Sequence, residues 1–327
     1  MKISRRRALA LAASSLALPG IAAAQAQAPW PNRPIRMVIP WPPGQATDLA
    51  GRVMAQHLQE RLGVPVVPEN RAGAGGTIGT DAVAKAAPDG YTILAASSGP
   101  VTIAPLLQRV PFDPEKDLQP VAMMGISPYL LVVKPDFPAR TTQEFIALLR
   151  ARPGHYTFGS SGTAATAHLI AEAFNARARV DALHVPFQGS SPSMTALMGG
   201  QIHYSIETLA ATNPLVRQGN LRALGISLAD GSTLAQGVEP FARVPDLAGF
   251  DAGAWLGVMV PGGTPRAIVD RLAAEVASGV ANPAVRSRIE SISVEPIARS
   301  TDEFTTYLRG QRELFQNIIR SANIRLD

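Results

Sequence analysis

The sequence predicts an α/β protein with two domains. Strand-like and helix-like segments alternate along almost the whole chain, which is typical of mostly parallel sheets with helices on their faces. The pattern begins again after residue 129, and 327 residues are enough for two domains. Around residue 253 the chain is expected to return to its first domain. We therefore predict one domain from residues 30–128 and 253–327 and a second from residues 129–252.

The first 26 residues have the organisation of a cleavable signal peptide. Lys2 and Arg5–Arg7 precede a short apolar stretch, Ala8–Leu18, and small residues follow it. The stretch is too short and its side chains too small to span a membrane stably. The arginines partly resemble a twin-arginine signal, so Sec and Tat export both remain open. We expect a soluble protein of the periplasm.

Composition excludes several classes of function. The formal net charge of +5 comes largely from residues 1–26, so the exported chain is nearly neutral and nucleic-acid binding gains little support. The absence of cysteine excludes disulfides and thiolate chemistry. A hydrophobic content of 46% with 17% charged residues indicates a globular protein with a full core.

Residues 35–48 predict a strand, a stiff loop and the start of a helix. Residues 37–39 suit a strand covered on both faces, and the prolines of the segment Pro40–Gly44 stop it because they lack N–H groups. Thr47 or Asp48 is expected to cap the helix. The free N–H groups and the dipole of a helix N-terminus attract anions. An ordinary strand-to-helix turn is the alternative.

Loops rich in Gly, Ser and Thr follow four predicted strands. These strands end near Ile39, Ala96, Phe158 and Phe187, and a helix is expected after each loop. Ligands of open α/β sheets bind at the carboxyl ends of strands. Hydroxyls and helix N-termini from two facing domains would hold a carboxylate without a buried arginine. The pattern favours a solute-binding cleft.

Nucleotide and metal sites find little support. The segment Gly73–Ile78 begins like a dinucleotide fingerprint, but Ile stands at its last position and no phosphate-loop lysine follows. His168 and Glu172 share a helix face at i, i+4 spacing, yet a tetrahedral metal site needs three or four ligands. We therefore expect no cofactor and no metal.

A secreted serine hydrolase is the alternative from another class. The segment Gly159–Gly162 offers Ser160 and Ser161 as nucleophiles, although it lacks the G-x-S-x-G spacing of a nucleophile elbow. His168 is poorly placed as a base, and the distant His184 remains open for that role. Turnover of ester substrates abolished by Ser161→Ala would support this alternative, whereas binding without turnover would oppose it.

Several motifs together resemble a known family. They run in order through essentially the whole exported chain and are PWPPGQATD (40–48), ENRAGAGG (69–76), AAPDGYT (86–92), PFDPEKDL (111–118), GSSGT (159–163) with HL (168–169), and VPFQGS (185–190). This set is similar to the periplasmic substrate-binding proteins of tripartite tricarboxylate transporters, the TctC-like or Bug proteins expanded in Bordetella. One departure is Gln45, because the family usually has a second glycine there.

The resemblance implies fold, ligand and partners. It implies a two-domain periplasmic-binding-protein architecture (Venus-flytrap, type II-like) with crossing interdomain strands, in which loops 40–48 and 159–166 grip a small carboxylate. It also implies a non-enzymatic, monomeric receptor that serves transporter permease subunits or, alternatively, a sensor kinase. The predicted ligand-binding residues are Trp41, Gly44, Gln45, Thr47, Asp48, Ser97, Ser160, Ser161, Thr163, Thr166, His168, Gln188, Gly189 and Glu207. Because like charges repel, Asp48 and Glu207 are expected to accept structural hydrogen bonds or contact a ligand amine.

Overall fold

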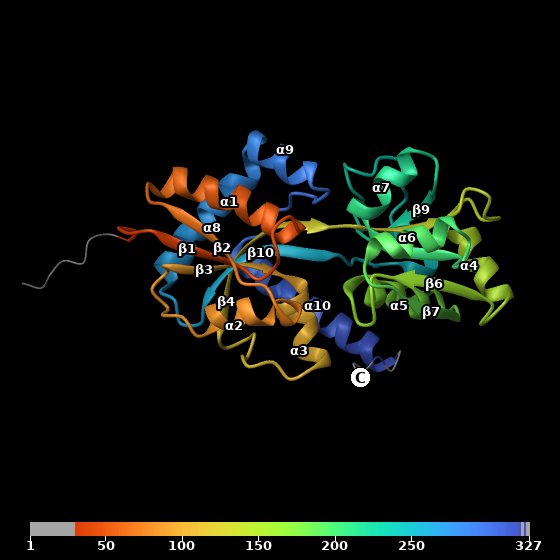
Figure 1. Cartoon of the computed structure of the whole chain (residues 1–327), viewed down its shortest axis with the longest axis horizontal. Helices are drawn as coiled ribbons and strands as arrows, with labels where there is room; N and C mark the ends of the chain where they lie inside the picture. Colours follow the sequence, from red (N-terminus) through yellow and green to blue (C-terminus); the bar gives the residue numbers. More distant parts are fainter. Residues whose placement is uncertain (1–29, 322–323, 325–327) are drawn as a thin grey trace, which may run out of the picture.

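The computed structural model describes residues 30–321 and 324, so the expected signal peptide lies outside the described residues. Two five-stranded sheets form two lobes that lie side by side, each with helices packed on its sheet (Figure 1). We call them the first lobe and the second lobe in the order in which the chain enters them. An α/β architecture is thus confirmed.

The first lobe has the strand order β2-β1-β3-β10-β4. Its strands are β1 (Ile35–Ile39), β2 (Val66–Asn70), β3 (Thr92–Ser97), β4 (Leu118–Ser127) and β10 (Ala254–Pro261). Its helices are α1 (Ala46–Leu62), α2 (Thr77–Ala84), α3 (Ala104–Leu107), α8 (Arg266–Ala281), α9 (Pro283–Ser291) and the first part of α10 (Thr301–Ser321), with short helical turns at Ala74–Gly76 and Gly99–Ile103. The helix α9 was not predicted from the sequence.

The second lobe has the strand order β7-β6-β8-β5-β9. Its strands are β5 (Tyr129–Val133), β6 (Tyr156–Ser160), β7 (Ala182–Pro186), β8 (Tyr204–Thr208) and β9 (Arg222–Ile226). Its helices are α4 (Thr142–Ala151), α5 (Thr166–Ala178), α6 (Ser190–Met198) and α7 (Leu209–Arg217), and two short turns follow at Phe241–Arg243 and Pro245–Leu247.

Both sheets are mixed, so the expectation of mostly parallel sheets is only partly right. In the first sheet β1, β2 and β3 are parallel, whereas β10 runs antiparallel to both β3 and β4. In the second sheet β6, β7 and β8 are parallel, whereas β5 runs antiparallel to β8 and β9. The antiparallel strands are β10 in the first sheet and β5 in the second. Each follows a crossing from the other lobe, and entry from that side reverses the direction of the strand.

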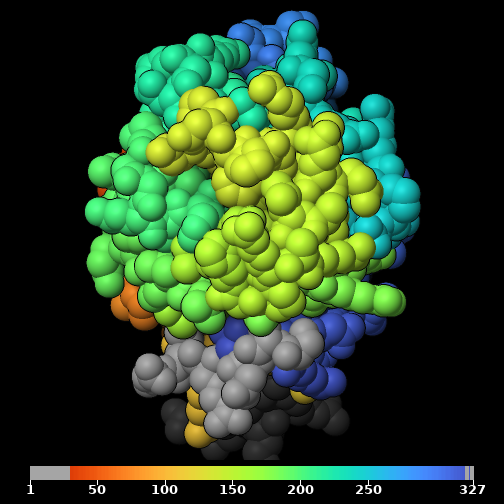
Figure 2. Space-filling model, turned by 90° about the vertical axis from the view of Figure 1, so that its right-hand side faces the viewer, coloured from red at the N-terminus to blue at the C-terminus, as the bar shows by residue number. Residues whose placement is uncertain are grey.

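The chain connects the lobes at several places. The strands β4 and β5 are separated only by Pro128, and a second crossing leads into β10 (Figure 1). The helix α10 packs Phe304 into the core of the first lobe and Phe315 into the core of the second. Viewed from its end, the molecule shows the second lobe in yellow-green and green with part of α10 in dark blue beside it (Figure 2). The domain boundaries given above therefore stay a prediction, with α10 shared between the lobes.

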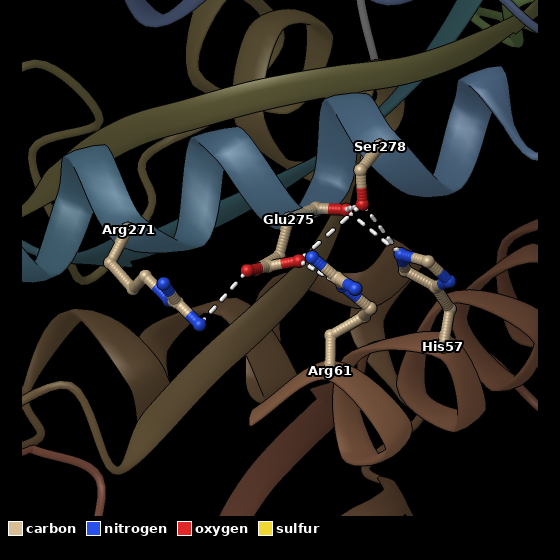
Figure 3. A network of polar contacts seen from close by, with 5 residues as sticks. All are labelled: His57, Arg61, Arg271, Glu275 and Ser278. Atoms are coloured by element: carbon tan, nitrogen blue, oxygen red, sulfur yellow. Dashed lines mark hydrogen bonds and ion pairs between the residues drawn. The ribbon is translucent and has the colours of Figure 1, made fainter. Parts of the chain in front are cut away.

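A polar network joins α1 to α8 on the outside of the first sheet (Figure 3). Glu275 is 4% exposed; its carboxylate accepts from Arg61 Nε at 2.8 Å and lies 3.0 Å from Arg271. His57 Nε2 lies 3.0 Å from the Ser278 hydroxyl and 3.1 Å from the Glu275 carbonyl. Burial alone would raise the pKa of Glu275, but Arg61, Arg271 and Ser278 lower it below the ordinary 4.5.

Glu275→Gln is expected to lower the free energy of unfolding by about 1–3 kcal/mol at pH 7, since it removes charge-assisted hydrogen bonds from a buried acceptor. The pKa of Glu275 is lowered in the folded state, so its stabilisation is present above the unfolded value near 4.5 and is lost as pH falls below it. Urea unfolding at pH 7 and pH 3.5 measures both effects.

The matched control is Asp270→Asn on the same helix. Asp270 pairs with Arg266, but both side chains are more than half exposed, so we expect a change within about 0.5 kcal/mol. Equal losses in the two variants would contradict a special role for the buried network.

Within residues 30–321, no helix is long and apolar enough to cross a bilayer.

Candidate functional site

A cavity of about 630 Å³ lies between the two lobes, where strands of both sheets end. Residues of both lobes and of the crossing strands contribute to its wall. They are Trp41, Gln45, Ala46, Thr47, Gly75, Ser97, Ser98, Gly99, Ile103, Ala104, Leu107, Gln108, Ser127, Tyr129, Ser161, Gly162, Thr163, Ala164, Ala165, Thr166, Ser190, Glu207, Thr208, Ala254 and Leu256. Apart from the segment 103–108 and the crossing strands, most of these residues lie in strand-to-helix connections.

The β1–α1 connection brings the N-terminus of α1 to the cavity. β1 is fully enclosed from Met37 to Ile39, and Pro40 ends it. Gly44 has φ +89°, a left-handed conformation that glycine adopts without strain. The N-cap is Gln45, and no described side chain caps the N–H groups of the first turn. Because Gln45 and Thr47 line the cavity, these free N–H groups lie next to it.

Asp48 fixes the β1–α1 connection by hydrogen bonds on the side away from the cavity. The expectation that Thr47 or Asp48 caps α1 is wrong, because the helix already begins at Ala46. Asp48 instead reaches back, and Oδ2 accepts from the Gly44 N–H at 2.9 Å. Oδ1 accepts from Arg52 Nε at 2.9 Å and from the Asn70 amide at 2.7 Å. Burial alone would raise the pKa of Asp48, but these hydrogen bonds lower it below 3.8.

Trp41 links the β1–α1 connection to neighbouring strands. Its indole Nε1 donates to the Ser97 hydroxyl at 2.8 Å, and its carbonyl accepts from the Asn70 amide at 2.9 Å. Both Trp41 and Ser97 line the cavity. The first-lobe wall is therefore held by hydrogen bonds between the ends of β1, β2 and β3.

The β6–α5 connection presents a second open helix N-terminus from the other lobe. The N-cap of α5 is Ala165, and no described side chain caps its N–H groups. Gly162 has φ +139° and Ala164 has φ +61°, so the connection turns sharply before the helix begins. Ser161, Thr163 and Thr166 line the cavity. Two open helix N-termini from different lobes suit one bound anion.

Two stacked histidines support the β6–α5 connection. The rings of His168 and His184 are 3.7 Å apart with an interplanar angle of 9°. His168 Nδ1 accepts from the Ala164 N–H at 3.0 Å, and His184 Nε2 lies 2.7 Å from the Ser160 hydroxyl. Burial, with a contribution from His168, lowers the pKa of His184 to about 4, so His184 is neutral at pH 7.

The Ser160–His184 pair does not form a hydrolase site. The Ser160 hydroxyl is fully buried, donates to the Gly162 carbonyl at 3.0 Å and accepts from the Gly162 N–H at 3.2 Å. Neither residue lines the cavity. Ser160 lies at the last position of β6 and shapes the connection, and Ser161 projects on the cavity side of it.

Glu207 is the acidic residue of the cavity wall. It lies near the end of β8, is 1% exposed, and its Oε1 accepts from the Thr208 N–H at 2.8 Å. Burial raises the pKa of Glu207, although the Thr208 N–H that donates to it and the nearby polar groups of Ser190 and Ser161 offset part of the rise. Burial also raises the pKa of the neighbouring Tyr129 phenol, and the Glu207 charge adds to this effect. Among the described residues of the wall, none is Lys, Arg or His.

The structure brings eight of the predicted ligand-binding residues to the cavity. They are Trp41, Gln45, Thr47, Ser97, Ser161, Thr163, Thr166 and Glu207. The other six do not line it: Gly44, Asp48, Ser160, Gln188, Gly189 and His168. Asp48, Ser160 and His168 are buried behind the connections, and Gln188 and Gly189 precede α6.

Sequence reasoning missed the wall contributed by Tyr129, Ser190 and Thr208. Tyr129 begins a crossing strand, and Ser190 and Thr208 stand at the start of α6 and α7. Ser190 and Thr208 could have been predicted, because a serine or threonine at the start of a helix is a recognisable pattern in the sequence. Within the described residues no group of three or more His, Cys, Asp or Glu side chains is arranged to hold a metal.

Comparisons with known proteins agree on one family. The sequence profile of the tripartite tricarboxylate transporter family receptors (TctC) matches residues 50–324. The chain is 36% identical to protein BugT of Bordetella pertussis over 324 residues, which cover 98% of each chain. A similar structure is R. palustris Rpa4515 with adipate, which is 28% identical with a TM-score of 0.72 over 90% of this chain and 99% of that one. Another is MatC from Rhodopseudomonas palustris with bound malate, which is 29% identical with a TM-score of 0.69 over 88% of this chain and 99% of that one.

Proposed function

Because this chain belongs to the family of tripartite tricarboxylate transporter receptors, we propose that it captures a small organic acid in the cavity between its lobes. The family consists of periplasmic solute-binding receptors, which are not enzymes. The observation that carries the proposal is the pair of open helix N-termini, α1 and α5, at one cavity without a cationic side chain among its described wall residues. N–H and O–H donors are what a carboxylate needs there.

The cavity volume supports a small ligand. A volume of about 630 Å³ lies within the range of small-molecule sites, roughly 300–1,000 Å³. Two similar structures hold the dicarboxylates adipate and malate. The ligand classes of the proposal are di- and tricarboxylates, acidic amino acids and aromatic carboxylates. Gln45 adds a side chain to the wall where the family usually has glycine, so we expect the ligand preference of this chain to differ from that of such relatives.

The proposed partners are the membrane permease subunits of a tripartite tricarboxylate transporter. The two lobes are joined by crossings next to the cavity, at Ser127, Tyr129 and Ala254. Hinge motion at these crossings would close the lobes over the ligand and present a closed receptor to the permease. Loss of uptake of the bound acid after deletion of this receptor tests the transport role, and loss of an acid-induced transcriptional response alone would indicate a sensor kinase instead.

A thermal-shift panel tests the binding role. The protein without residues 1–26 is unfolded, refolded to remove bound ligand, and mixed with citrate, C4–C6 dicarboxylates, acidic amino acids, nicotinate and phthalate isomers. A ligand at a hundredfold excess over its Kd stabilises the fold by about 2.7 kcal/mol, which raises Tm by several degrees. A shift confined to one class of acid is expected. No shift with any acid, for properly folded protein, would contradict the proposal.

A further inference from the structure

Glu207 is an acid without a positive partner at the cavity wall. Its Oε1 accepts from the Thr208 N–H, but its Oε2 is enclosed and has no hydrogen bond of ordinary geometry to any described residue. Burying a carboxylate without a counter-charge is costly. Its position at the cavity points to a role toward the ligand.

The groups around Glu207 are hydroxyls rather than cations. Ser161 and Ser190 line the cavity with Glu207, and the Ser161 hydroxyl and N–H and the Ser190 hydroxyl lie near its carboxyl group and favour its ionised form. Tyr129 is the other titratable group of the described wall, and it lies on β5, the strand paired with β8, opposite Thr208. The first lobe contributes no titratable side chain to the described wall. The ligand is the remaining source of positive charge.

The direction of the two serine hydroxyls decides what this part of the wall offers to a ligand. A serine hydroxyl has one hydrogen and two acceptor lone pairs. When the hydrogen points toward the Glu207 carboxylate, Ser161 and Ser190 offer only lone pairs to the cavity. This part of the wall then accepts hydrogen bonds, whereas the N-termini of α1 and α5 donate them.

We propose that Glu207, acting through Ser161 and Ser190, selects ligands that carry an ammonium group beside their carboxylates, so that amino dicarboxylates bind in preference to their deamino counterparts. The proposal rests on the carboxylate-receptor function above. Glu207 is a positioning residue in this account, because the hydroxyls make the contact. A positive group here also removes the isolated negative charge of the closed cavity.

Isothermal titration calorimetry with matched ligand pairs tests the selection. The pairs are L-aspartate with succinate and L-glutamate with glutarate. We expect the wild-type protein to bind at least one amino acid tenfold or more tightly than its partner. Glu207→Gln is expected to reduce this ratio at least tenfold by weakening the amino acid and not the dicarboxylate. Glu275→Gln, the same substitution at a buried acid outside the cavity, should leave the ratio unchanged.

Proton linkage separates the two possible states of Glu207. An ammonium group lowers the pKa of Glu207, so its binding releases protons at any pH where the free Glu207 is partly protonated, whereas a second carboxylate raises that pKa and takes protons up. Titrations in two buffers with different ionisation enthalpies measure the sign. Release for the amino acid in the wild type and no release in Glu207→Gln are expected.

Three results would overturn the selection of amino dicarboxylates. The first is tighter binding of succinate or glutarate with proton uptake, which makes Glu207 a neutral acid that donates to the ligand. The second is an unchanged ratio in Glu207→Gln. The third is that neither pair binds. The carboxylate-receptor function would then be contradicted as well only if citrate and the aromatic acids also leave Tm unchanged.

Discussion

Thr166→Asp is expected to abolish carboxylate binding while leaving the fold as stable as the wild type or more so. Thr166 is the first residue of α5 and lines the cavity. A carboxylate in the first turn of a helix interacts favourably with the helix dipole. The same carboxylate would repel a bound anion at about 4 Å by roughly 4 kcal/mol at an effective dielectric constant near 20. This corresponds to about a thousandfold loss of affinity.

Thr166→Asn is the matched control for this experiment. Asparagine has nearly the shape of aspartate but no charge, so we expect its affinity to fall less than tenfold. Calorimetry with the best ligand of the panel gives the affinities, and urea unfolding gives the stabilities. If Thr166→Asp binds as well as Thr166→Asn, the ligand carboxylate does not lie at the N-terminus of α5.

The connections that form the site were predictable because their chemistry is local. Prolines that cannot continue a strand, followed by a glycine and a helix former, predict the β1–α1 connection from residues 40–46 alone. The serines and threonines of residues 160–166 predict the β6–α5 connection in the same way. Eight predicted residues therefore reach the cavity, and the α/β alternation predicts two sheets.

The remaining features depend on contacts between distant parts of the chain. Nothing local to β10 indicates that it enters its sheet antiparallel, because that direction follows from the crossing between lobes. The roles of His168 and Ser160 depend on His184, which lies in another strand. The pairing of β5 with β8 places Tyr129 opposite Thr208 and so brings it to the cavity. The distinction between lining the cavity and supporting its wall required the structure.

Asp48→Ala is expected to lower both stability and ligand affinity. Asp48 is 1% exposed and its carboxylate accepts from Gly44, Arg52 and Asn70. Its removal leaves the Asn70 amide and the Gly44 N–H without this acceptor and releases the connection before α1. We expect the free energy of unfolding to fall by about 2–4 kcal/mol, the range for removing a buried charged acceptor from several donors. Affinity should fall at least tenfold, because the first helix N-terminus is no longer held toward the ligand.

The pH dependence identifies the charge of Asp48 as the cause. The pKa of Asp48 is lowered in the folded protein, so its stabilisation is present above the unfolded value near 3.8 and is lost as pH falls below that value. The stability difference between wild type and Asp48→Ala should therefore shrink between pH 5 and pH 2.5. Asp136→Asn, at a largely exposed acid near Lys134, should change stability by less than about 0.5 kcal/mol at either pH. A difference that does not change with pH would assign the loss to packing around Gly44 and Asn70 and not to the carboxylate.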